Sequence, residues 1–151
     1  MQERFEMFTV LINRISRNIR RIKNQEMAEY NLRSAHVSCL YYIYSLNGAT
    51  STDLCERCEE DKATISRSLD YLEKNGYITR DNEGAKRYKS PLQLTEKGFE
   101  VGNKIADKIG EVLDEISVGL SEKERADFYR SLSVISESLD SVSKKAENKV
   151  I

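Results

Sequence analysis

The segment 50–76, TSTDLCERCEEDKATISRSLDYLEKNG, restricts the possible folds of this chain more than any other part of it. Thr50 followed by Asp53 has the form of a capping box, with Asp in place of the usual Glu, and predicts the start of a short helix. Asp61 is the expected N-cap of a second helix, which has three apolar residues at helical spacing, Ile65, Leu69 and Leu72. Two short helices that meet across about three residues are typical of a helix-turn-helix.

A β-hairpin is expected after these helices, the second of which should end at Asn75 and Gly76. The runs YITR at 77–80 and YKSPLQL at 88–94 have strand-like compositions and are joined by a polar segment. Pro91 has no amide hydrogen to donate, so the second strand should lie at a sheet edge. A helix-turn-helix followed by a hairpin, the wing, is a winged helix, and the expected fold class is therefore mainly α with a small β-hairpin.

Apolar stripes predict further helices on both sides of this lobe. The stripe of the first helix comprises Phe5, Phe8, Ile12, Ile15, Ile19 and Ile22. The two stripes after the hairpin comprise Val101, Ile105, Ile109, Val112 and Ile116, and Phe128, Leu132, Ile135, Leu139 and Val142. A capping box at Ser121 and Glu124 begins the last helix. A shorter helix, which should stop at Asn47 and Gly48, carries Leu32, His36, Leu40 and Ile43.

These stripes also predict the domain organisation and a partner. Three long stripes exceed what one small lobe can cover, and apolar patches of that size mark interfaces, so we expect a homodimer. We assign residues 1–151 to a single domain, in which 1–32 and 96–151 form the helical dimerisation region. Residues 33–95 form the winged helix-turn-helix lobe.

The outward face of the second short helix, together with the local charge, predicts nucleic-acid binding. The chain has a net charge of -1, but residues 62–97 hold 8 basic and 5 acidic residues. If the apolar residues are buried, the 100° step between residues turns Ala63, Thr64, Ser66 and Arg67 outward. Hydroxyls and Arg can contact base edges or phosphates, and Ala can meet a thymine methyl. Asp70 is the sole acid expected on that face.

Three strings in the chain resemble one known family. Residues 50–80, KRYKSPLQLTEKG at 86–98 and LSEKE at 120–124 are similar to the MarR (multiple antibiotic resistance regulator) family of dimeric winged-helix transcription factors. The most specific passages are LEKNGYITR and LTEKG, and the similarity extends over nearly the whole chain. The resemblance implies that Ala63, Thr64, Ser66 and Arg67 face the major groove and that Lys86 and Arg87 lie at the wing. The family often has Asp two residues before the wing Arg, where this chain has Ala85.

The sequence therefore predicts a cytoplasmic, homodimeric DNA-binding transcription regulator, a repressor relieved by a small-molecule effector, on a pseudo-palindromic duplex site. The candidate DNA-binding residues are Ser51, Lys62, Ala63, Thr64, Ser66, Arg67, Lys86 and Arg87. The candidate effector-binding residues are His36, Tyr41 and Tyr44. The start, MQERFEMF, lacks the pattern of a signal peptide, and the apolar run 37–46 is half of the about 20 residues that a membrane span needs. No membrane partner is expected.

Other classes of function receive less support from the sequence. With a single His the chain has no HExxH motif, and it lacks a phosphate-binding Gly-rich loop and a GxSxG elbow, so we expect no enzyme. His36, Cys39, Cys55 and Cys58 have a zinc-like spacing, which leaves a zinc or thiol-redox sensor as an alternative. Because buried Cys behaves as a small hydrophobe, we expect structural cysteines, no bound metal and no cofactor. A helical interaction module without DNA binding is a second alternative.

Overall fold

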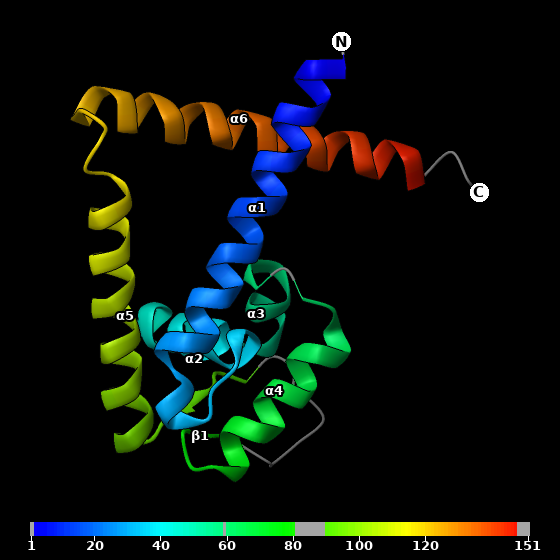
Figure 1. The fold of residues 1–151 in the computed structure, drawn as a ribbon. Coiled ribbons are helices and arrows are strands. Elements are labelled where there is room, and N and C mark those ends of the chain that lie inside the picture. The colour runs from blue at the N-terminus through cyan, green and yellow to red at the C-terminus, as the bar shows by residue number, and fades with distance from the viewer. Residues whose placement is uncertain (1, 59, 81–89, 148–151) are drawn as a thin grey trace. The chain divides into compact units, whose positions relative to one another are not determined.

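The computed structural model describes residues 2–58, 60–80 and 90–147 and is mainly helical (Figure 1). Its elements are α1 (Gln2–Glu26), the 3-10 helix η1 (Ala28–Tyr30), α2 (Ser34–Leu46), α3 (Ser51–Arg57), α4 (Lys62–Lys74), β1 (Ile78–Thr79), β2 (Gln93–Leu94), α5 (Glu96–Ile116) and α6 (Glu122–Glu147). Two compact units are present, Met1–Ile109 and Gly110–Ile151. Among the described residues no helix is both long and apolar enough to cross a membrane.

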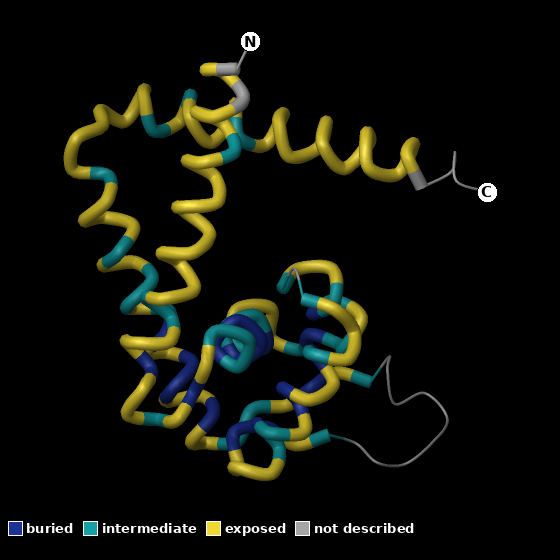
Figure 2. The backbone as a smooth tube through the Cα atoms, turned by 45° about the vertical axis from the view of Figure 1, so that its right-hand side comes forward, coloured by how far each residue is buried: buried dark blue, intermediate teal, exposed yellow. Residues whose placement is uncertain are grey.

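The core of the first unit lies where α2 packs against α4 and α3 (Figure 2). The three apolar residues predicted to be buried on α4 are indeed in this core, with at most 2% of each exposed. Leu40 and Ile43 face them from α2, and Leu54 does so from α3. Leu32, expected in the same helix as Leu40, instead precedes α2, which begins at Ser34 because its N-cap Arg33 is extended, with φ -101° and ψ 167°. Leu32 is nevertheless buried.

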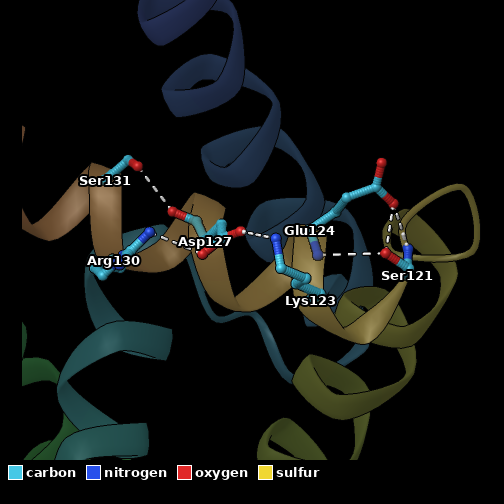
Figure 3. Close-up of polar contacts among 6 residues, drawn as sticks. All are labelled: Ser121, Lys123, Glu124, Asp127, Arg130 and Ser131. Carbon is cyan, nitrogen blue, oxygen red and sulfur yellow. Dashed lines mark hydrogen bonds and ion pairs between the residues drawn. The ribbon is translucent and has the colours of Figure 1, made fainter.

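Local capping signals define the helix ends as the sequence predicted. The Asp53 amide donates to Thr50 Oγ1 at 3.2 Å, and the Thr50 amide donates to Asp53 Oδ2 at 2.7 Å. The helix α2 stops at Asn47, which has a φ of 46°. In the second unit, the Ser121 amide donates to Glu124 Oε2 at 2.8 Å and the Glu124 amide returns a bond to Ser121 Oγ (Figure 3). These bonds satisfy amides that a helix leaves unpaired at its first turn.

The two strands pair antiparallel, with Ile78 opposite Leu94 and Thr79 opposite Gln93. Among the described residues of the runs 77–80 and 88–94 from which we predicted them, Tyr77, Arg80 and residues 90–92 lie outside the strands. One reason is that the Leu92 amide donates to the carbonyl of Ala49, in the turn before α3, and so is used outside the hairpin. Pro91, beside it, has no amide hydrogen to donate. The Leu92 bond thus links the segment before β2 to the turn before α3.

The apolar stripes of α1 and α6 are exposed in the single chain. On α1, Ile15 is 49% exposed and Ile19 is 48% exposed. On α6, Phe128, Ile135, Leu139 and Val142 are exposed, although each lies on the predicted stripe. The side chain of Phe5, at the start of the α1 stripe, lies outside the described residues. Exposed apolar surface of this extent is typical of an interface.

Gly98, in the first turn of α5, lies very close to the backbone of the first unit. A Cβ atom at this position would stand 1.8 Å from the carbonyl oxygen of Tyr77. That carbonyl also accepts the Thr95 amide at 3.1 Å, and Thr95 Oγ1 donates to the carbonyl of Gly76 at 2.6 Å. The start of α5 is therefore held directly against the segment that links α4 to β1.

We predict opposite effects of two Gly→Ala substitutions in α5. Gly98→Ala forces backbone apart and should lower the free energy of unfolding by about 1–3 kcal/mol. Gly110→Ala meets nothing within 4 Å. It should raise that free energy by about 0.5–1 kcal/mol, since Ala loses less conformational entropy in a helix. Urea unfolding of both variants beside the wild type measures the difference, and equal stabilities of Gly98→Ala and wild type would contradict the close approach.

Candidate nucleic-acid interface

The helix α4 separates its residues into a buried and an exposed face. Ile65, Ser68, Leu69 and Leu72 are buried, whereas Lys62, Ala63, Ser66 and Arg67 are exposed and Thr64 is half-buried. This is the orientation predicted from the 100° step between residues. The exposed residues occupy the first two turns of the helix, so small and polar side chains border its N-terminus. Contact between these residues and DNA stays a prediction.

A chain of hydrogen bonds holds Arg67 against the start of α4. Asp61 Oδ1 accepts the Thr64 amide at 2.7 Å, and Asp61 Oδ2 accepts Thr64 Oγ1 at 3.0 Å. Arg67 Nη2 in turn donates to Thr64 Oγ1 at 3.0 Å. The backbone amide of Thr64 is the main reason that the pKa of Asp61 lies below its usual value, and its hydroxyl adds to the effect. Because a guanidinium has five N–H donors, Arg67 retains donors for a base or a phosphate.

A hollow of about 650 Å³ lies between α3, α4 and the end of β1. Four of the predicted DNA-binding residues line it, namely Ser51, Lys62, Ala63 and Ser66. Ser51 is the first residue of α3 and Lys62 is the first of α4, so the helix-turn-helix brings both helix starts to one depression. Hydroxyl and ammonium groups there suit the phosphate backbone of a duplex.

Arg80 also lines this hollow and was missed in the sequence analysis. Its Nη2 donates to Asp70 Oδ1 at 2.6 Å and its Nε donates to Glu73 Oε2 at 2.9 Å. Burial acts against the charge of Arg80, but the hydrogen bonds to Glu73 and Asp70 outweigh it and raise the pKa of the guanidinium. The sequence signal for this cluster consists of Asp70 and Glu73, three residues apart, followed by Arg80 after a turn. That signal does not by itself identify the partners.

The predicted wing residues Lys86 and Arg87 lie outside the described residues, as does Ala85. Their role at the wing therefore stays a prediction. In the described part of the hairpin, β1 follows α4 and β2 precedes α5.

The three candidate effector residues lie on α2 and have different neighbours. His36 stacks on Tyr71 of α4 with a centroid distance of 4.2 Å, and its Nδ1 accepts the Arg33 amide. Burial is the main reason that the pKa of His36 is lowered. Tyr41 packs edge-on against Tyr42. Tyr44 donates its hydroxyl to Asn103 Oδ1 of α5 at 2.9 Å, so α2 is linked to both α4 and α5.

The cysteines gather at the core edge without forming a metal site. Cys39 is fully buried, whereas Cys55 and Cys58 are half-buried. A hydrogen bond from the Cys39 thiol to Cys58 raises the pKa of Cys39, and burial adds to this effect, while the same bond lowers the pKa of Cys58. In the part of the chain that the structure describes, no three His, Cys, Asp or Glu residues are grouped so that they could hold a metal ion. The zinc alternative therefore gains no support.

Comparison with known proteins identifies the fold and the family resemblance. Residues 30–87 match the model of the MarR family. The HTH-type transcriptional regulator BilQ of Clostridioides difficile (strain CD3) is 24% identical over 131 residues, which are 87% of this chain and 88% of that protein. BilQ is named as a transcriptional regulator.

Two solved structures show the same architecture. The MepR–DNA complex of Staphylococcus aureus has a TM-score of 0.77 at 21% identity and covers 87% of this chain and 97% of its own. A MarR family transcriptional regulator of Listeria monocytogenes, complexed with a 26mer DNA, has a TM-score of 0.76 at 27% identity and covers 85% of each chain. The winged-helix fold and the resemblance to the MarR family, both predicted from the sequence, are confirmed.

We predict that Asp61→Asn changes the acid sensitivity of the fold while keeping the cap. Asn caps a helix about as well as Asp, but it does not titrate. The Asp61 carboxyl has a folded-state pKa below its ordinary 3.8, so its contribution to stability is present above that value and is lost as the pH falls through the folded-state pKa. Urea unfolding between about pH 2 and pH 4 should therefore show a weaker loss of stability for Asp61→Asn. The same acid dependence in both proteins would contradict this role.

Proposed function

Because residues 30–87 match the model of the MarR family within a winged-helix fold, we propose a function in transcription. The protein is a dimeric, sequence-specific DNA-binding transcription regulator. The observation that carries the proposal is the exposed first two turns of α4, where Ala63, Ser66 and Arg67 stand opposite the buried face of the helix. Small and polar side chains there allow a helix to approach base edges in a major groove. A related structure that is 27% identical contains DNA, which supports the same role for this chain.

We propose that the helices outside the winged lobe make the dimer. The lobe is residues 33–95, and the dimerisation region is 1–32 together with 96–151 of one domain. The exposed stripes of α1 and α6 support this assignment, because a second copy of the chain would remove their apolar side chains from water. A two-fold dimer presents two recognition helices and therefore fits a pseudo-palindromic operator.

Regulation by a small molecule is the third part of the proposal. We propose a repressor that an effector releases, with His36, Tyr41 and Tyr44 as the residues that sense it. The support is their position on α2, since His36 contacts α4 through Tyr71 and Tyr44 contacts α5 through Asn103. A ligand that displaces the His36–Tyr71 contact changes how α4 is held, and one that displaces the Tyr44–Asn103 contact changes how α5 is held. A protein that acts on chromosomal DNA works in the cytoplasm of a bacterial cell, which is the location that we propose.

We predict that the double variant Ile15→Asp/Ile19→Asp is a folded monomer. Both side chains lie on the exposed stripe of α1, and charges there would be buried without partners in a dimer. Asn13→Asp/Asn18→Asp, which adds the same two negative charges on the same helix but off the stripe, is the matched control and should stay dimeric. Sedimentation at micromolar concentration measures the mass, and a folded wild-type monomer would contradict the proposed dimer.

We predict that Arg67 and Arg87 contribute differently to DNA binding. Arg67→Ala should cost roughly 1–3 kcal/mol on the native site and relax the preference at one position per half-site, because Arg67 stands on the face that meets base edges. Arg87→Ala should weaken binding to all duplexes, because a wing Arg meets a phosphate or an A·T-rich minor groove. It should also lower the salt slope by about one unit for each phosphate that the variant no longer neutralises.

The experiment begins with selection of fragments of genomic DNA that the wild-type protein retains. The selected duplex and a scrambled duplex are then titrated with wild type and both variants at several salt concentrations. If the wild type does not prefer the selected duplex, the proposed function is wrong. If Arg67→Ala weakens both duplexes equally, Arg67 contacts the backbone and the base-reading assignment fails.

A further inference from the structure

The side chain of Arg80 is largely buried beside α4, where it forms ion pairs with two acids. Its side chain is only 11% exposed and lies between the carboxylates of Asp70 and Glu73, both on α4. Two of its nitrogens donate to these acids. Because Arg80 directly follows β1, the guanidinium reaches back across the Asn75–Tyr77 turn to the C-terminal part of α4.

The two acids occupy an unfavourable place for a DNA-binding protein. Asp70 follows Ser66 and Arg67 at the i+4 and i+3 positions, so it lies one turn further along the same exposed face. Its side chain is 62% exposed, and Glu73 is a further turn away. Phosphates that pack against the first turns of α4 come within a Debye length, about 8–10 Å, of these carboxylates. Two uncompensated charges at that distance would repel the duplex.

We propose that Arg80 is a positioning residue for DNA binding, which draws the Asp70 and Glu73 carboxylates toward the end of β1 and cancels part of their charge. This inference rests on the proposed function. Arg80 acts through the two acids rather than as a reader of DNA, because most of its surface is buried and two of its nitrogens already donate to carboxylates. The group remains charged throughout the pH range in which the protein folds, since its pKa is raised.

The test removes the cation and then removes the acids that it neutralises. Arg80→Gln should weaken binding to the selected duplex by about fourfold at low salt, the size expected for the loss of one unit charge about 10 Å from phosphate in each protomer of a dimer. The loss should shrink as salt rises, because salt screens the repulsion. The triple variant Arg80→Gln/Asp70→Asn/Glu73→Gln should bind at least as tightly as the wild type, since its cluster is neutral whereas that of the wild type has a net charge of -1.

Arg130→Gln is the matched control. Arg130 lies on α6 and pairs with Asp127 at 2.8 Å, so this variant loses the same charge and also leaves an acid behind (Figure 3). It should bind the duplex like the wild type. Wild-type binding is measured first, so a failure of the proposed function is seen before any variant is compared.

Two outcomes would overturn the inference. One is that Arg80→Gln binds the selected duplex as tightly as the wild type, and the other is that the triple variant binds as weakly as Arg80→Gln. Circular dichroism monitors folding of each variant. If Arg80→Gln does not fold, the test uses the double variant Asp70→Asn/Glu73→Gln, in which Arg80 is intact. This double variant should bind the selected duplex at least as tightly as the wild type does. Weaker binding would overturn the inference.

Discussion

The burial of one face of α4 against α2 is the interaction on which the rest of the structure depends. Ile65, Leu69 and Leu72 enter a core completed by Leu40 and Ile43, and full burial of each such side chain contributes about 1.5–3 kcal/mol. This packing fixes the rotation of α4 about its own axis. With the buried positions fixed, residues on the opposite side of the helix, such as Ala63, Ser66 and Arg67, face solvent. The exposed polar surface of α4 is thus a direct consequence of core packing.

A second set of short contacts connects this core to the long helix α5. The Tyr77 amide donates to the carbonyl of Leu72 at the end of α4, and the Tyr77 carbonyl accepts the amide of Thr95 just before α5. Gly98 then lies against the same carbonyl, where no side chain fits. The end of α4 and the start of α5 are therefore both bonded to Tyr77. Such contacts have little room to adjust, so the position of the first turns of α5 is coupled to the end of α4.

The sequence predicted local features well because their causes are local. The caps at Thr50, Asp61 and Ser121 each involve partners three residues apart, and the buried face of α4 follows from helical periodicity. The pairing of Arg80 with Asp70 was not predictable in the same way, because it depends on the turn that returns the chain beside α4. The bond from Leu92 to Ala49 spans still more of the sequence. A pattern of residue types limits such partners but does not select among them.

The charges around α4 also determine where attraction for phosphate must come from. The N-terminus of a helix favours anions, but here Asp61 already occupies that position and accepts the Thr64 amide. Asp53 likewise caps the start of α3. Both helix starts of the helix-turn-helix thus already hold a carboxylate, which leaves less of their positive potential for a phosphate. We therefore propose that the attraction comes from side chains such as Lys62 and Arg67, and that Arg80 strengthens it by offsetting the acids further along α4.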